Sequence, residues 1–138
     1  MINRINIQFL ISYLGFLPFV LILFDKFFLS KLEPNIMKDF VIFYSLIILV
    51  FIGALNWDLK KNISTKLVIL GFMPSILSVI IIFLFLYSYE VFLLIIICFL
   101  LQLIFDNYIY KKKFERYIYY KIRIPLTLLI VSSLFLIQ

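Results

Sequence analysis

The chain has 138 residues, of which 66% are apolar and only 14% are charged, and its mean hydropathy is +1.20. Soluble globular domains contain about 45–50% apolar and about 25% charged residues, so the composition excludes that class. The core of a soluble domain of this length has no room for seventeen Phe and nine Tyr. We therefore predict an integral membrane protein.

The net charge of +6 does not indicate nucleic-acid binding, because the basic residues lie between apolar runs and no nucleic-acid motif accompanies them. We expect them to set the topology and to contact the anionic headgroups of the lipid bilayer. The chain has no histidine and one cysteine, Cys98, which excludes an intrachain disulfide and a His/Cys metal site. Dinucleotide, Walker and Gly-x-Ser-x-Gly motifs are also missing. We therefore expect no metal, no cofactor and no enzymatic activity.

Five apolar runs are long enough to cross a bilayer. The first begins with Gln8 and is closed by Asp25-Lys26; no small-x-small cleavage site follows it, so we interpret it as an uncleaved helix. A tight turn at residues 88–90 joins the third and fourth runs. The sequence predicts an all-α polytopic membrane protein of five transmembrane helices, two hairpins plus a closing helix. The single transmembrane domain covers residues 1–138, with spans at about 8–24, 40–57, 67–87, 91–107 and 124–138.

The distribution of Lys and Arg predicts the orientation. With five spans, the N-terminus and the second and fourth loops share one side, which holds ten of these residues. The other side holds three, Lys26, Lys31 and Lys38. The positive-inside rule then predicts a cytoplasmic N-terminus and an external C-terminus. We expect a bacterial inner (plasma) membrane, with the mitochondrial inner membrane as the alternative.

Small residues and prolines recur within the runs. Leu14-Gly-Phe-Leu-Pro-Phe19 matches Leu70-Gly-Phe-Met-Pro-Ser75, which suggests a weak internal repeat of the two hairpins. The prolines are expected to kink their helices, and the glycines are expected to let helices approach closely. The residues predicted to act in packing or kinking are Gly15, Pro18, Gly53, Gly71 and Pro74.

Several polar side chains fall near the predicted cytoplasmic ends of the spans. A lipid-facing amide would cost several kcal/mol, so we expect them to point inward. The candidate cluster consists of Asn56, Asp58, Gln102, Asp106 and Arg123. Two interpretations remain open: interhelical contacts with interface charges, or a polar vestibule for a proton or small solute.

Within this cluster, Arg123 with Asp106 is the preferred ion pair. Trp57 is predicted to anchor the helix at the interface. The basic and aromatic residues 111–121 are predicted to lie on anionic headgroups as a short amphipathic segment.

Taken in order, five motifs resemble those of a family of small five-span proteins. They are Leu14-Gly-x-x-Pro18-Phe19, Gly53-x-x-x-Trp57, Pro74-Ser75-x-Leu77, Gln102-Leu-x-x-Asp106 and Arg123-x-x-Leu126-Thr127. The family is an uncharacterised bacterial one related to eukaryotic transmembrane protein 69. Its members tend to have histidine or arginine before the tryptophan and glycine after it, where this chain has Asn56 and Asp58. The resemblance implies a fold and a membrane location, and no activity.

Three functions follow as hypotheses. The first is a non-enzymatic subunit or assembly or scaffold component of a membrane complex, which contacts other membrane proteins or itself. The second is a small transporter or channel for a proton or small solute, lined by Gln102 and Asp106. The third, a lipid-modifying enzyme, is the least favoured because no catalytic set accompanies it.

Overall fold

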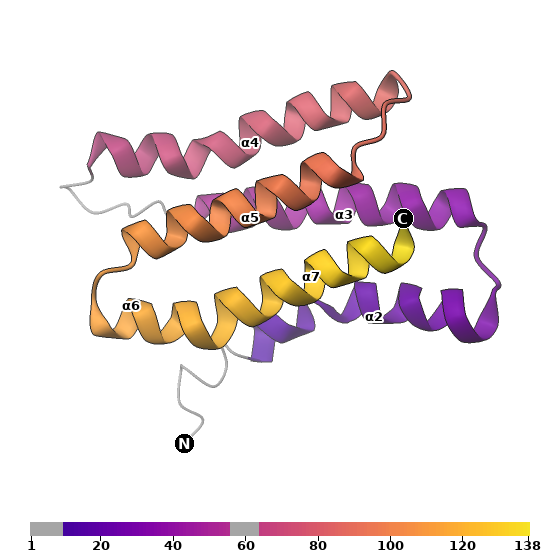
Figure 1. Ribbon diagram of the computed structural model, residues 1–138, viewed down its shortest axis with the longest axis horizontal. Coiled ribbons are helices and arrows are strands. Elements are labelled where there is room, and N and C mark those ends of the chain that lie inside the picture. Colours follow the sequence, from indigo (N-terminus) through magenta and orange to yellow (C-terminus); the bar gives the residue numbers. More distant parts are fainter. Residues whose placement is uncertain (1–9, 56–63) are drawn as a thin grey trace. The chain divides into compact units, whose positions relative to one another are not determined.

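The described part of the chain consists of helices and the short connections between them. The computed structural model describes residues 10–55 and 64–138, and no strand occurs in these ranges (Figure 1). Among the described residues, five helical stretches are long and apolar enough to cross a membrane: Leu10–Leu29, Pro34–Ala54, Thr65–Leu86, Phe92–Ile109 and Glu115–Ile137. At about 1.5 Å per residue, each matches the thickness of a bilayer's hydrocarbon core. The predicted fold class is confirmed, and the chain is a membrane protein.

The first span continues beyond its predicted end at residue 24. Helix α2 (Leu17–Phe24) runs into a π-helical turn, η1 (Asp25–Leu29), which the Ser30 N–H closes with a 2.7 Å hydrogen bond to the Asp25 carbonyl. Ser30 then ends the helix in the left-handed conformation, with φ at 49°. The Asp25-Lys26 pair therefore lies within the last turn of the span.

The second span begins earlier than its predicted start at residue 40. Helix α3 (Pro34–Ala54) has proline at its first position, where the ring supplies a helical φ and the missing N–H would have no partner in any case. Proline therefore acts here as the start of the helix.

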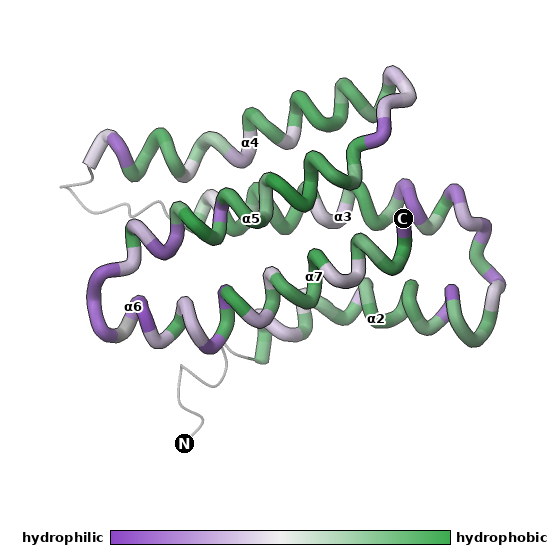
Figure 2. Tube along the Cα trace, viewed as in Figure 1, coloured by the Kyte–Doolittle hydropathy of each residue, from purple (hydrophilic) through white to green (hydrophobic). Residues whose placement is uncertain are grey.

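The last span also differs from its prediction. Helix α6 (Lys113–Ile118), the π-helical turn η2 (Tyr119–Arg123) and α7 (Ile124–Ile137) follow one another without a break. Most of the segment expected to lie alone on the membrane surface thus belongs to the last helix. Figure 2 shows hydrophilic residues gathered around α6 and the connection before it, whereas α7 is mainly hydrophobic.

The described residues form two compact units, which lie within Met1–Val41 with Tyr110–Gln138 and within Ile42–Ile109. In the first unit, α2 packs against α7. The Tyr13 hydroxyl donates to the Lys121 carbonyl at 2.9 Å, and Lys26 Nζ donates to the Leu136 carbonyl at 2.6 Å. The first bond joins the N-terminal parts of the first and last spans, and the second joins their C-terminal ends. The two spans therefore run in the same direction. An odd number of crossings requires this parallel course.

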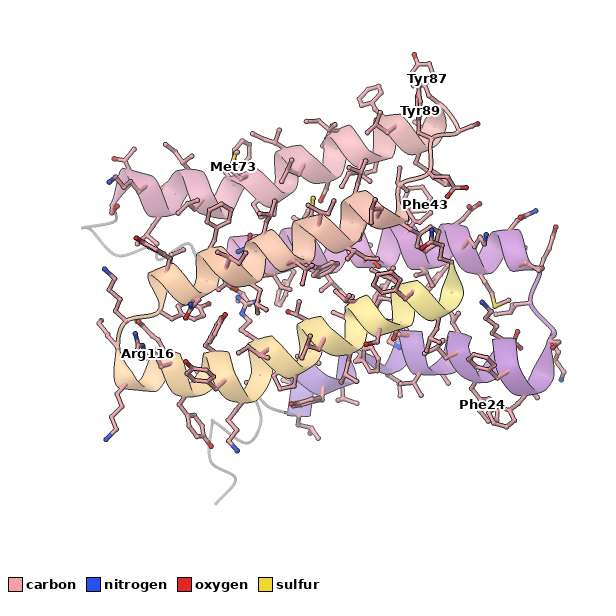
Figure 3. The ribbon with its side chains drawn as sticks, in the orientation of Figure 1. Phe24, Phe43, Met73, Tyr87, Tyr89 and Arg116 are labelled. Carbon is pink, nitrogen blue, oxygen red and sulfur yellow. The ribbon has the colours of Figure 1, made fainter. Side chains whose placement is uncertain are left out.

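The second unit contains the hairpin of α4 (Thr65–Leu86) and α5 (Phe92–Ile109), which pack against each other (Figure 1). Tyr87 and Tyr89 lie at the turn between them, and Ser88 adopts a φ of 62° there (Figure 3). The ring of Phe43 on α3 meets that of Phe85 edge-on, with centroids 5.4 Å apart. Helix α3 begins in the first unit and ends in the second.

Candidate functional site

The polar face of α5 is the best-defined part of the candidate site. Cys98, Gln102 and Asp106 are spaced four residues apart, so they share one face of the helix, and all three are buried. Gln102 Nε2 donates a 3.0 Å hydrogen bond to Asp106 Oδ1. Asp106 is only 1% exposed, and a buried carboxylate depends on donors of this kind. Such an amide–carboxylate pair can stabilise helix packing or bind a proton.

Arg123 is a buried residue of the π-helical turn η2. It is 8% exposed, and its Nη2 donates a 3.2 Å hydrogen bond to the hydroxyl of Tyr110. The Tyr110 ring meets Tyr119 edge-on at 6.2 Å, and Tyr119 meets Tyr120 edge-on at 5.5 Å. The phenol oxygen of Tyr110 thus gives the guanidinium one hydrogen-bond acceptor.

The structure brings together two residues of the predicted polar cluster, Gln102 and Asp106. Arg123 lies in the other unit, so its pairing with Asp106 stays a prediction. Asn56 and Asp58 lie outside the described residues, as does the predicted interface anchor Trp57.

Gly53 lies at a close approach between α3 and α4. A Cβ atom built on Gly53 would come within 2.7 Å of both the Gly71 carbonyl oxygen and Pro74 Cγ. Real side chains do not tolerate this distance from a backbone oxygen, so only glycine fits without a shift of one helix. Gly71 and Pro74 are buried on α4. These three residues therefore form one interhelical contact.

The two matched Gly-Phe-x-Pro segments behave differently. The helix is interrupted at Gly15 and Phe16 and restarts at Leu17, with Pro18 in the first turn of α2. The kink expected at Pro18 is therefore a break, because proline cannot donate to the carbonyl four residues earlier. Pro74, by contrast, lies inside the uninterrupted helix α4. Among the described residues, a Cβ on Gly15 would meet only the carbonyl oxygens of Ser12 and Ile11, the nearer at 3.3 Å, so no other described helix approaches Gly15 closely.

Two charged residues with specific partners were missed by the sequence analysis, which used Asp25 and Lys26 only as the end of a span. Asp25 is 7% exposed, and its carboxylate accepts the N–H of Leu32 at 2.9 Å. Lys26 Nζ donates to the carbonyl of Ile137 at 3.3 Å as well as to that of Leu136. The position of this acid–lysine pair after an apolar run could have indicated a specific contact. The partners of Lys26 could not be predicted, because they lie at the far end of the chain.

Two further observations concern ligand chemistry. The hydroxyl of Ser78 on α4 is buried and has no hydrogen-bond partner among the described residues. Within residues 10–55 and 64–138, no three His, Cys, Asp or Glu side chains are grouped to hold a metal ion. The candidate site therefore consists of two hydrogen-bonded pairs, Gln102 with Asp106 and Arg123 with Tyr110.

Comparison with known proteins gives a family and no activity. The model of the family described as "Protein of unknown function (DUF3429)" matches residues 6–137. No curated protein matches the chain, and no solved structure matches it either.

Proposed function

Because this chain belongs to the DUF3429 family of proteins of unknown function, we propose that it is a non-enzymatic subunit or assembly component of a membrane complex. One observation carries the proposal: the described polar groups of the candidate site are bound by side chains of their own unit. Gln102 holds Asp106, and Tyr110 holds Arg123. The first bond lies within α5, and the second joins η2 to the connection that precedes α6. Both hold buried or half-buried side chains in place within the fold, which favours a structural role.

The proposal includes a location and an orientation. The chain lies in a bacterial inner membrane with a cytoplasmic N-terminus, and its family is related to eukaryotic transmembrane protein 69. The excess of ten Lys and Arg on one side over three on the other supports the orientation.

Helix α4 offers the surface for a partner helix. Its large apolar side chains are exposed over the length of the helix: Phe72, Ile76, Val79 and Phe83 are between 43% and 60% exposed. In lipid, helices associate by dispersion and shape, so such a face accepts either acyl chains or the side chains of another helix. We propose the second, with another membrane protein or a second copy as the partner.

Photocrosslinking in intact membranes tests this proposal. A benzophenone side chain at Phe83, which is 60% exposed, is expected to capture a second polypeptide in a discrete band. The matched control is the same side chain at Phe85, two residues away in α4 and packed edge-on against Phe43, which is expected to react within the chain. Two tag lengths distinguish a second copy from a different protein. Lipid adducts alone at Phe83 would refute the proposal.

A second candidate function, a small transporter or channel for a proton or small solute, rests on the same buried pair. Asp106 is an ionisable group within a candidate span, and such groups often mark ion pathways. In proteoliposomes with an internal pH dye, the wild-type chain would then carry a proton flux that Asp106→Asn abolishes. Equal rates for wild type, variant and empty vesicles would exclude the proton pathway.

A further inference from the structure

Exposed basic residues are concentrated between Lys111 and Lys121, in the connection before α6, in α6 and in η2. Five cations are exposed here, and we call them the basic stripe: Lys111, Lys112, Lys113, Arg116 and Lys121. The one carboxylate of the segment, Glu115, accepts the backbone N–H of Lys112 at 3.1 Å and so fixes the start of α6. The segment therefore has five cationic side chains and one carboxylate, and that carboxylate already accepts a backbone hydrogen bond.

Helical spacing brings aromatic side chains into the stripe. In α6, Lys113, Arg116 and Tyr117 follow the i, i+3, i+4 pattern of one helix face. Tyr120 follows in η2, and all four side chains are exposed (Arg116 is labelled in Figure 3). The buried side chains of η2, Tyr119, Ile122 and Arg123, are therefore not part of this face. One face of the helix thus combines ammonium, guanidinium and phenol groups.

Exposed apolar side chains follow farther along the same helix. Leu128 and Leu129 on α7 are 52% and 41% exposed, one to two turns beyond the end of η2. A ligand that covers both regions needs an anionic end and a hydrocarbon end. Nucleic acids and soluble acidic proteins have the first and lack the second.

We propose that the basic stripe is a binding site for the phosphodiester headgroup of an anionic phospholipid, whose acyl chains lie along α7. Arg116 supplies the planar fork that matches phosphate oxygens, the lysines add point charges, and the phenols donate to phosphate or glycerol oxygens. The fatty chains cover the exposed leucines. This activity does not depend on the proposed role in a membrane complex.

Quenching by brominated lipid measures the site directly. The full chain with Trp57→Phe and Tyr120→Trp, which leaves one tryptophan beside the stripe, is reconstituted into phosphatidylcholine vesicles. Brominated phosphatidylglycerol is added in increasing fractions, with brominated phosphatidylcholine as the neutral reference. We expect the anionic lipid to be bound in preference by about fivefold for each cation that contacts the headgroup.

Variants of equal charge separate a site from the overall charge of the protein. K113Q/R116Q is expected to lower the preference by at least about fivefold, whereas K31Q/K38Q, which removes the same charge elsewhere, leaves it unchanged. Both must keep the helix content and elution volume of the parent. Equal losses in the two variants, or no preference in the parent, would overturn the proposal. It would also be overturned if an oligonucleotide bound through the stripe while the two lipids quenched equally.

Discussion

The ammonium group of Lys26 lies 2.6 Å from the carbonyl oxygen of Leu136, in the last turn of α7. The last four carbonyls of a helix have no partner within the helix and carry its partial negative charge. Lys26 meets two of them, since it also reaches Ile137. The end of the first span is thereby tied to the end of the last.

Loss of this tie is expected to destabilise the fold. Lys26→Met removes hydrogen bonds from a charged donor, and we expect a loss of about 1–2 kcal/mol in the free energy of unfolding. Unfolding of the purified protein in mixed detergent micelles, followed by circular dichroism, measures the loss. Lys31→Met is the control, because Lys31 is exposed on the connection that follows η1. Equal stability of the two variants would contradict the role given to Lys26.

The contact at Gly53 predicts a steric effect. Gly53→Ala places a methyl group 2.7 Å from the Gly71 carbonyl oxygen, so α3 and α4 must separate, at a cost of about 1–3 kcal/mol. Gly15→Ala is the matched control and is expected to change stability by less than about 1 kcal/mol. The same unfolding assay compares them. If Gly53→Ala were as stable as Gly15→Ala, the close approach would not exist in the membrane.

The hydrogen bond between Gln102 and Asp106 predicts coupling in a double-mutant cycle. Gln102→Leu leaves the buried Asp106 carboxylate without one donor and is expected to cost about 1–3 kcal/mol. In an Asp106→Leu background the same substitution is expected to cost about 1 kcal/mol less, because the bond is already gone. Additive losses would show that the two side chains do not interact.

The pairing of Asp106 with Arg123 is open to a charge-swap test. Asp106→Arg and Arg123→Asp are each expected to lower expression and stability strongly, since each leaves like charges near the membrane. The double variant D106R/R123D is expected to recover part of the loss. Failure of the two substitutions to rescue each other would reject the pair.

The orientation is tested by labelling from the outside. In a Cys98→Ala background, Lys31→Cys is expected to react with a membrane-impermeant maleimide in intact spheroplasts, because the first loop is predicted to be external. Arg116→Cys is expected to react only after permeabilisation. Both side chains are exposed, so burial does not explain a difference. The reverse pattern would invert the proposed topology.

Much of the fold could be predicted from the sequence because the bilayer restricts the choice. A run such as Leu67 to Tyr87 must be helical, since lipid offers no partners for its backbone groups. The matched segments around Pro18 and Pro74 show a property that could not be predicted, namely whether the helix breaks near the proline. Their local sequences agree, yet one helix breaks and the other continues with its proline beside Gly53. The same local sequence therefore occurs at a helix break and inside a continuous helix, so the local pattern does not determine which of the two forms.

The candidate site was predictable in part for a similar reason. Gln102 and Asp106 are four residues apart on one helix, so spacing alone places them together. The partners of Lys26 and Tyr13 are backbone carbonyls more than a hundred residues away. Every residue has a backbone carbonyl, so the sequence does not indicate which carbonyl accepts these hydrogen bonds.

The π-helical turn η2 contains one residue more than an α-helical turn, and the Ile124 N–H spans it by bonding to the Tyr119 carbonyl. One extra residue corresponds to about 100° of rotation around the axis. Residues of α7 are therefore rotated by that angle about the axis, relative to residues of α6, from where a regular α-helix would place them. The two helices still follow one another without a break. Deletion of Tyr120 would restore a regular α-helix and leave the spacing within each part intact. The number of residues in this turn thus determines the rotation, about the helix axis, between the charged start of the last helix and its membrane-crossing part.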